Sequence, residues 1–352
     1  MKYIKKSVLG LPTYSVPQTN TLVKLNQNES PFDIPADIKQ EIFRKILRLS
    51  WNRYPPFSAD SLIHKLAAHT GHDPEGIAAG NGSNELIQCI IHANCDSKNP
   101  LVISRPAFSL YKRVAAIMNI KSIEVPLTRS FNFNPDEICK AGKKASLILL
   151  DNPNNPSGKS LSFEEIEHIA RNFSGILAID EAYYEFCRTT VQPLLSKYQN
   201  IVILRTFSKA FGAAGIRLGY ILGNRKILAQ LKKVPLPFSL GVFQQTAGEI
   251  LLSRWSDLQE NILKIIQERE RIYRDLSRIK RIITFPSQAN FICFKPKTID
   301  AAELYQKLQN RNVLIRSFSN PDLKQFLRVT IGTNEENSIF ITALKTALKE
   351  KI

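Results

Sequence analysis

The chain has 352 residues, of which 43% are hydrophobic and 22% are charged, a balance typical of a soluble globular protein. This length exceeds that of one ordinary core and predicts two domains. Apolar runs are too short for a membrane span, and Pro12 and Pro17 interrupt the apolar stretch near the start. We therefore expect neither a membrane span nor a signal peptide.

The formal net charge is +17 at pH 7, from 48 Lys and Arg against 31 Asp and Glu. Such a charge suits either nucleic acid or phosphorylated small molecules. The basic residues form scattered pairs such as Lys5-Lys6 and Lys143-Lys144, without the long run of a nucleic-acid-binding protein. We therefore favour a small phosphorylated ligand and expect no nucleic-acid partner, with a basic non-enzymatic nucleic-acid binder as the alternative from another class.

The cysteine pattern indicates a reducing compartment. The number of cysteines is odd and none forms a C-x-x-C pair, so neither a disulfide framework nor a zinc site is indicated. We expect a cytoplasmic protein without a metal site. The cysteines are Cys89, Cys95, Cys139, Cys187 and Cys293.

Residues 1–30 have no strong period and carry two prolines, so we expect an extended arm that lies against the body or against a partner subunit. Beyond the arm, short apolar runs alternate with helical spacers, one of which starts with the capping-box pair Ser162 and Glu165. This alternation predicts an α/β domain with a mostly parallel seven-stranded sheet. The seven runs are 77–79, 101–104, 122–125, 146–150, 176–180, 201–204 and 218–222.

The pattern breaks near Pro237, and an amphipathic helix over 256–280 leads to a smaller α+β domain. We expect strands over 289–294, 313–316 and 327–331, a helix over 300–309 and a final helix after Thr333. Asp300 with Glu303 and Thr333 with Glu336 have the spacing of capping boxes. The predicted parts are an arm (1–30), a large domain (31–250) and a small C-terminal domain (251–352).

The stretch around Lys209 carries the strongest chemical signal. The apolar run 201–204 predicts a strand buried on both faces, which places Thr206, Ser208 and Lys209 at its carboxyl end. That end of an open α/β sheet faces the ligand crevice. With Arg217 in the glycine-rich turn that follows, these side chains indicate an anionic cofactor beside an amine nucleophile.

A second anion-binding signal is the sequence G-N-G-S-N-E at residues 80–85, between an apolar run and a helical pattern. We expect Ser83 to cap this helix while its first free N–H groups face an anion. A plain capped helix without a ligand is the alternative, because the third glycine of a dinucleotide-binding motif is replaced by Glu85.

These motifs resemble those of a known family. The lysine signature of fold-type I pyridoxal-phosphate aminotransferases, S-K-x-x-x-x-x-G-x-R-x-G, is matched at Ser208, Lys209, Gly215, Arg217 and Gly219. Within that family, L-N-Q-N-E-S-P at residues 25–31 resembles a segment of histidinol-phosphate aminotransferases. The resemblance spans nearly the whole chain, although Ser30 and Asn84 replace a usual asparagine and a usual aspartate.

The resemblance implies pyridoxal 5′-phosphate as the cofactor and assigns residues around its ring. Lys209 would bind the aldehyde and move the proton, and Asp180 would keep the pyridine nitrogen protonated. Tyr183 and Asn155 would donate to the phenolate oxygen, while Phe108 would stack on the ring.

The resemblance also implies how the cofactor phosphate is held. Its ligands would be the backbone at Ser83 and Asn84, the side chains of Thr206, Ser208 and Arg217, and Tyr54 of a neighbouring subunit. A tyrosine from a neighbour implies a homodimer with shared active sites.

For the substrate, Arg328 resembles the arginine that binds an α-carboxylate, and Arg316 resembles one that binds a substrate phosphate. Tyr14 and Asn28 would complete that substrate site. The resemblance thus implies ping-pong transamination between histidinol phosphate and 2-oxoglutarate or glutamate, a reaction of histidine biosynthesis. A threonine-phosphate decarboxylase and an aromatic amino acid aminotransferase of the same fold are the alternatives.

Overall fold

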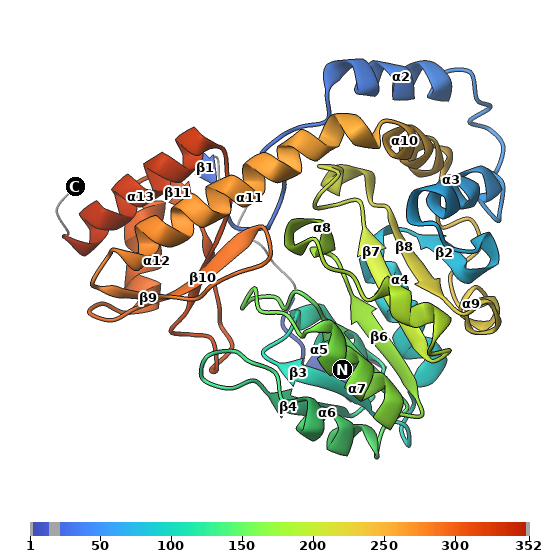
Figure 1. The fold of residues 1–352 in the computed structure, drawn as a ribbon, viewed down its shortest axis with the longest axis horizontal. Coiled ribbons are helices and arrows are strands. Elements are labelled where there is room, and N and C mark those ends of the chain that lie inside the picture. The colour runs from blue at the N-terminus through green and yellow to red at the C-terminus, as the bar shows by residue number, and fades with distance from the viewer. Residues whose placement is uncertain (1–2, 14–21, 350–352) are drawn as a thin grey trace.

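The computed structural model describes residues 3–13 and 22–349, which form a large lobe and a smaller C-terminal lobe (Figure 1). The large lobe contains a seven-stranded sheet and the small lobe a four-stranded antiparallel sheet. The predicted α/β fold with a mostly parallel sheet and a second α+β unit is therefore confirmed.

The large sheet has the strand order β2-β8-β7-β6-β5-β3-β4. Neighbouring strands from β7 to β4 run parallel, whereas β8 is antiparallel to both β2 and β7. All seven predicted strands are present, as β2 (Ile77–Gly80), β3 (Leu101–Arg105), β4 (Ser122–Pro126), β5 (Leu147–Asp151), β6 (Ile176–Asp180), β7 (Ile201–Thr206) and β8 (Gly219–Gly223).

Alternation along the strands explains why the sheet is buried on both faces. In β7, Ile201 and Ile203 enter one core while Val202 and Leu204 enter the other. The first core includes apolar side chains of α2 (Ala36–Ile46), α3 (Asp60–Thr70), α6 (Pro135–Gly142), α7 (Phe163–Asn172) and α10 (Val242–Ser253). The second includes those of α4 (Gly82–Asn94), α5 (Ser109–Ile117) and α9 (Arg225–Leu231).

The predicted long helix is α11 (Trp255–Ser277), which runs from the large lobe to the small lobe (Figure 1). The small sheet has the order β12-β13-β10-β9. Its core is shared with α11 and with α12 (Ala301–Gln309) and α13 (Asn334–Leu348). The strands are β9 (Ile282–Thr284), which was not predicted, β10 (Phe291–Pro296), β12 (Arg316–Ser317) and β13 (Leu327–Thr330).

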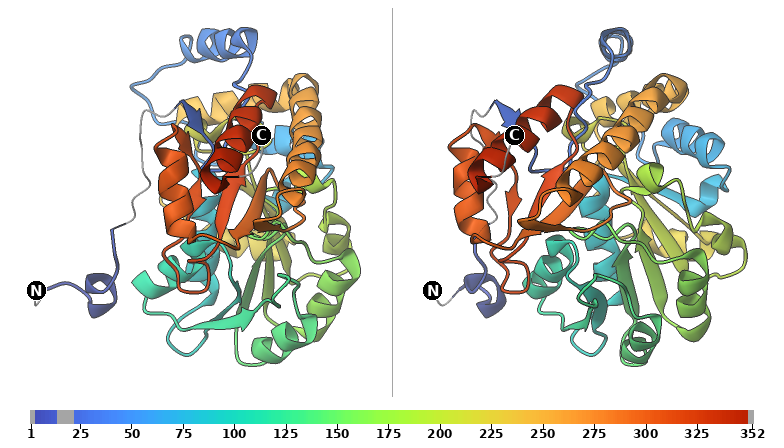
Figure 2. Two further views of the ribbon diagram at one scale, coloured as in Figure 1. Left: turned by 90° about the vertical axis from the view of Figure 1, so that its left-hand side faces the viewer. Right: turned by 60° about the vertical axis from the view of Figure 1, so that its left-hand side comes forward.

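The strand expected over 313–316 is divided between two sheets. Its first half, β11 (Val313–Leu314), pairs in parallel with β1 (Val23–Lys24) of the N-terminal arm, and its second half, β12, pairs with β13. This pairing anchors the part of the arm that leads to Asn28. The short helix α1 (Lys6–Leu9) buries none of its residues and lies at the edge of the large lobe, where Oγ of Ser7 donates to the carbonyl oxygen of Ile117 in α5 at 3.5 Å (Figure 2).

Two of the predicted helix starts are confirmed in full. Ser162 with Glu165 and Thr333 with Glu336 form complete capping boxes at α7 and α13. Asp300 does occupy the N-cap of α12, but its side chain makes no cap hydrogen bond, so the predicted box with Glu303 is wrong. Asp300 is exposed, where water competes for its carboxylate.

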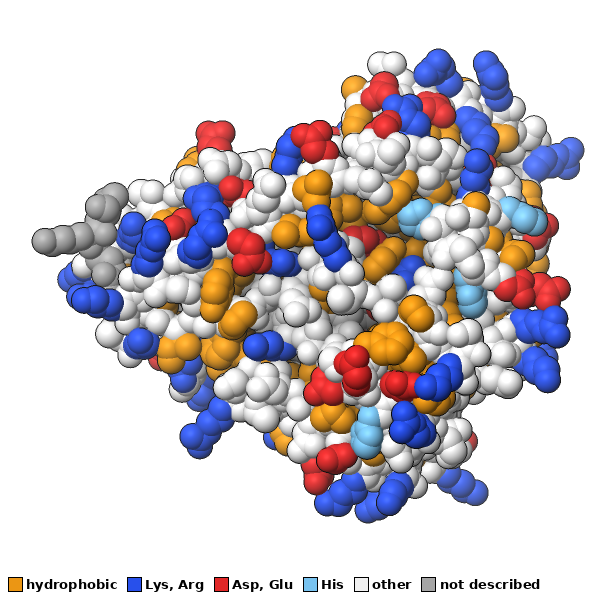
Figure 3. Space-filling view, viewed as in Figure 1, with side chains coloured by type: hydrophobic (Ala, Val, Ile, Leu, Met, Phe, Trp, Pro, Cys, Tyr) orange, Lys and Arg blue, Asp and Glu red, His pale blue; other side chains and the backbone are white. Residues whose placement is uncertain are grey.

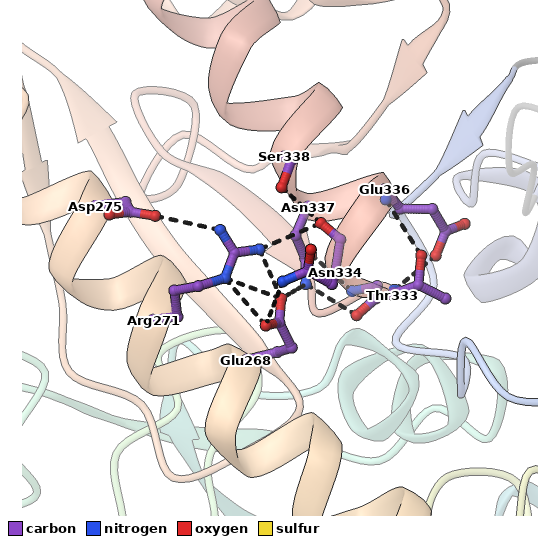
Figure 4. Close-up of polar contacts among 9 residues, drawn as sticks. Glu268, Arg271, Asp275, Thr333, Asn334, Glu336, Asn337 and Ser338 are labelled. Carbon is purple, nitrogen blue, oxygen red and sulfur yellow. Dashed lines mark hydrogen bonds and ion pairs between the residues drawn. The ribbon is translucent and has the colours of Figure 1, made fainter.

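The start of α13 is fastened to α11 by a polar cluster (Figure 4). The fully buried Asn337 accepts from the N–H of Gly332 and donates to Oε2 of Glu268, at 2.9 and 2.8 Å. Glu268 also accepts from Nη2 of Arg271 at 2.7 Å. These bonds fix the turn that directly follows β13, the strand that carries Arg328.

On the face drawn in Figure 3, Lys and Arg side chains surround both lobes and alternate with acidic ones rather than forming one basic stripe. Across residues 3–13 and 22–349, no helix combines the length and apolar character needed to cross a membrane.

Candidate active site

Lys209 follows the carboxyl end of β7 and meets the N-terminal arm. The backbone N–H of Ser208 donates to Oγ1 of Thr206 at 3.1 Å, which fixes the turn that follows the strand. The Nζ of Lys209 donates to the carbonyl oxygen of Gln27 at 3.0 Å. Burial lowers the pKa of Lys209 to about 7, and the positive charge of Arg328 acts in the same direction. Much of this amine is therefore neutral and nucleophilic near neutral pH.

Next to Lys209, Arg217 and two glycines form a narrow, positively charged cradle. Nη1 of Arg217 donates to Oγ of Ser208 at 3.1 Å. A Cβ at Gly82 would lie 2.5 Å from Nη2 of Arg217, and a Cβ at Gly219 would lie 2.6 Å from the backbone nitrogen of Ser83. Glycine is needed at both positions because the backbone and the guanidinium approach so closely. A small anion such as a phosphate fits this arrangement.

The cradle includes the beginning of α4, where the expectation that Ser83 caps the helix is wrong. The helix begins at Gly82, whose φ is +74°, and Asn81 holds the N-cap without a side-chain hydrogen bond. Ser83 and the exposed Asn84 thus lie in the first turn, where N–H groups point out of the helix. Together with the helix dipole, an uncapped start favours an anion.

Asp180 is buried at the carboxyl end of β6. It accepts from Oη of Tyr111 at 2.8 Å and from the N–H of Ala182 at 3.1 Å. Burial raises the pKa of Asp180 to about 6, while these two hydrogen bonds oppose the rise. Tyr111 was not predicted, although its position three residues after Phe108 on a helix facing the sheet was a usable signal.

Three further predicted residues gather around the hydroxyl of Tyr183. Nδ2 of Asn28 donates to this hydroxyl at 2.9 Å and Nδ2 of Asn155 at 3.5 Å. Nη1 of Arg328 donates in turn to Oδ1 of Asn155, and Nη2 of Arg328 donates to the carbonyl oxygen of Asn26 at 2.9 Å. The large lobe, the small lobe and the arm therefore meet at one buried polar cluster.

Two residues that were not predicted hold Asn28 in place. Oγ1 of Thr330 accepts from the N–H of Asn28 at 2.9 Å, and Nδ2 of Asn290 donates to the carbonyl oxygen of Asn28 at 3.1 Å. Asn28 has a φ of 55°, in the left-handed region that asparagine tolerates. Thr330 could have been found because it lies two residues after Arg328 on the same strand, but nothing in the sequence indicated Asn290.

Phe108 is half-buried just after β3 and meets the ring of Tyr111 edge-on, with 5.6 Å between ring centroids. Its N–H donates to Oδ2 of Asp151 at 3.1 Å.

The remaining predicted residues lie elsewhere or outside the described chain. Tyr54 is 81% exposed and stacks on Phe238 at 4.4 Å between ring centroids. Arg316 is half-buried and pairs across the sheet with Arg328. Tyr14 lies outside the described residues.

Known proteins resemble the chain over nearly its full length. The model of the family described as aminotransferase class I and II matches residues 20–344. A histidinol-phosphate aminotransferase of Pyrococcus furiosus is 36% identical over 347 residues, covering 99% of this chain and 98% of that protein. One of Thermococcus gammatolerans is 33% identical over 342 residues, covering 97% and 96%.

Solved structures agree in fold. The histidinol-phosphate aminotransferase of Sinorhizobium meliloti in complex with pyridoxal-5′-phosphate superposes with a TM-score of 0.90 at 24% identity, covering 99% of this chain and 98% of that one. The L-threonine-O-3-phosphate decarboxylase of Porphyromonas gingivalis gives 0.82 at 23% identity, covering 94% and 100%. The match to the family model and the identity to its members show that this chain belongs to the aminotransferase class I and II family.

Proposed function

We propose that this protein is a pyridoxal 5′-phosphate-dependent transaminase that exchanges the amino group between histidinol phosphate and 2-oxoglutarate or glutamate, a reaction of histidine biosynthesis. The observation that carries the proposal is that a buried Lys209, whose pKa is lowered to about 7, interacts electrostatically with both Arg217 of the cradle and the Asp180 carboxylate. The names of the relatives at 33% and 36% identity favour this substrate over others.

Lys209 and Asp180 are the proposed catalytic groups, assisted by Tyr183. When bound, the cofactor supplies an electron sink for the negative charge that develops at the substrate Cα. Lys209 would hold the cofactor aldehyde through its unprotonated amine and, as a free amine, would be the base that moves the proton at the substrate Cα. The carboxylate of Asp180 keeps the pyridine nitrogen protonated.

The cradle and the polar cluster support the other proposed cofactor contacts. Tyr183 and Asn155 donate hydrogen bonds to the phenolate oxygen, and Phe108 packs on the ring. The phosphate is bound by the backbone N–H groups at Ser83 and Asn84 and by the side chains of Thr206, Ser208 and Arg217.

Arg328 and Arg316 are the proposed anchors for anionic substrates. Arg328 binds the glutamate carboxylate, and Arg316 adds a second guanidinium for the substrate phosphate. Asn28 borders the same space, and Tyr14 is proposed to approach the phosphate from the arm.

We further propose a homodimer in which Tyr54 reaches the cofactor phosphate of the neighbouring subunit. The support is a set of large apolar side chains exposed on the single chain, part of which is joined by ring contacts between Trp51 and Phe243 and between Tyr54 and Phe238. It comprises Phe43, Leu47, Trp51, Tyr54, Phe57, Leu236, Phe238 and Phe243, each at least 42% exposed in the single chain.

Two remaining proposals concern organisation and location. We divide the chain into an arm (1–30), a large cofactor-binding domain (31–250) and a small domain (251–352). The five cysteines are unpaired, which favours the cytoplasm.

The deciding experiment is a single-turnover assay of the cofactor-loaded protein. The amino donors are histidinol phosphate, histidinol, phosphoserinol, phenylalanine and glutamate. The reaction with each donor is measured as the loss of cofactor absorbance. We expect histidinol phosphate to react fastest and removal of its phosphate to slow the reaction at least about tenfold. If phenylalanine reacts fastest, the protein is an aromatic aminotransferase, and release of carbon dioxide from threonine phosphate would identify a decarboxylase.

A further inference from the structure

Asp151 is a buried carboxylate that the functions proposed above do not use. It ends β5, is 2% exposed, and pairs in register with Asp180 on the neighbouring strand β6. Two carboxylates therefore lie side by side at the carboxyl end of the sheet. A buried carboxylate is costly unless hydrogen bonds compensate for its lost hydration.

Three donors converge on the Asp151 carboxylate. Oδ2 accepts from the backbone N–H groups of Phe108 and Asn155, at 3.1 and 2.8 Å. Oδ1 accepts from Nδ2 of Asn154 at 2.8 Å. One side chain thus ties the loop after β3 to the loop after β5.

Asn154 strengthens the same connection from the other side. It is fully buried, and its Nδ2 also donates to the carbonyl oxygen of Pro106 at 3.0 Å. Its Oδ1 accepts from the N–H of Ser157 at 3.2 Å. Asn154 cannot exchange its oxygen and nitrogen without losing these bonds, so position 151 must present acceptors only.

We propose that Asp151 is a positioning residue that sets the spacing between Phe108 and Asn155 and so holds both against opposite parts of the cofactor ring. The inference rests on the proposed cofactor site, in which Phe108 covers the ring face and Asn155 meets the phenolate edge. An oxygen shared by both backbone N–H groups links their positions directly, so displacing one loop displaces the other.

The hydrogen bonds around Asp151 compensate for its burial and for the nearby negative charge of Asp180. Burial raises the pKa of Asp151 to about 7, the hydrogen bonds from Asn155 and Asn154 oppose the rise, and the charge of Asp180 adds to it. Tyr111 and Tyr183 are the other titratable groups that interact with it. The charge-assisted bonds to the two loops are what favour its ionised form.

The variants that test the inference are Asp151→Ala, Asp151→Asn and, as a control, Asn152→Ala. Asn152 is 7% exposed in the same loop, and its Oδ1 accepts from the N–H of Leu161 at 2.8 Å. The control therefore removes a buried loop acceptor whose hydrogen bond goes to Leu161 instead of to Phe108 or Asn155. Asp151→Asn keeps the shape of the side chain but places its own NH₂ group against the NH₂ group of Asn154.

The first measurement is hydrogen exchange of the cofactor-free proteins, in peptides covering residues 105–110 and 152–158. Asp151→Ala should speed exchange about tenfold or more in both peptides, because one acceptor serves both loops. Asn152→Ala should leave 105–110 unchanged. If Asp151→Ala leaves 105–110 as protected as in the wild type, or if the control exposes it equally, Asp151 is not a positioning residue.

The second measurement is the dissociation constant of pyridoxal 5′-phosphate and the visible circular dichroism of the loaded proteins. We expect Asp151→Ala to weaken binding about tenfold or more and to reduce the cofactor band, with Asp151→Asn between it and the wild type. If Asp151→Ala does not fold, Asp151→Asn alone must show both effects. A wild type that takes up no cofactor would overturn the proposed function, whereas the exchange result tests the link between the loops independently.

Discussion

Arg316 lies directly opposite Arg328 in the antiparallel pairing of β12 with β13. Side chains at such paired positions leave the sheet on the same face, so two arginine side chains project from neighbouring positions on one face. Neighbouring like charges repel, and an anion between them would remove that repulsion. The pair is thus suited to a doubly charged ligand group such as a phosphate monoester.

From this pairing we predict that substitution separates the two half-reactions. Arg316→Ala should remove roughly 2–3 kcal/mol of binding from histidinol phosphate, because one charge-assisted contact is lost, and should affect glutamate less. Arg328→Ala should damage both. Single-turnover rates with each donor measure the difference, with the exposed Arg311→Ala as a matched control. Equal losses for both donors in Arg316→Ala would contradict the assignment.

Lys209 should control cofactor uptake by its protonation. Its pKa is lowered to about 7, so uptake by the cofactor-free protein should accelerate as pH rises through that value and the ammonium loses its proton. Lys209→Ala should bind the cofactor without a covalent bond and show no multiple turnover. Borohydride treatment of the loaded wild type, followed by peptide mapping, should find the cofactor on Lys209, and a label on another lysine would show the assignment to be wrong.

Asp180→Asn should slow proton removal far more than it weakens cofactor binding. Losing one preorganised charge typically raises a barrier by a few kcal/mol, or about 10²–10³ in rate. Single-turnover rates and a cofactor titration of the same protein separate these effects. Near-normal turnover in Asp180→Asn would rule out the proposed role of the carboxylate.

Shared active sites predict recovery of activity in mixed dimers. A chain with Lys209→Ala should be inactive and a chain with Tyr54→Phe should be impaired. A dimer of the two contains one complete site, because the second chain supplies Lys209 and Arg217 and the first supplies Tyr54. Activity after verified subunit exchange measures this. If exchange occurs and no activity returns, each site is built from a single chain.

The buried ion pair between Glu181 and Arg205, at the carboxyl ends of β6 and β7, should contribute strongly to the free energy of unfolding. Their side chains are 1% and 3% exposed, and Nη2 of Arg205 lies 2.9 Å from Oε2 of Glu181. Glu181→Ala leaves the guanidinium without its carboxylate and should cost about 3–5 kcal/mol. Urea unfolding of the cofactor-free protein measures the loss, and the exposed Glu260→Ala should change it by less than about 0.5 kcal/mol.

The large sheet could be predicted because most of its strands are short apolar runs, a local property of the sequence. β1 and β9 could not, because two or three residues become strands only through distant partners. The same distinction holds at the site. Lys209, Ser208 and Arg217 belong to one segment, whereas Asn290 reaches Asn28 across 262 positions and carries no local signal.

The bonds of Arg328 to Asn155 and to the backbone of Asn26 have a consequence for affinity. A carboxylate that approaches this guanidinium competes with partners already present, so its arrival exchanges hydrogen bonds instead of adding them. The net gain per contact is therefore small, which suits a site that must release one acid before accepting another amine. When a carboxylate takes the place of Asn155 on Arg328, the amide oxygen of Asn155 needs a new donor. The same amide donates to the hydroxyl of Tyr183, so binding of an acid at Arg328 also affects Tyr183.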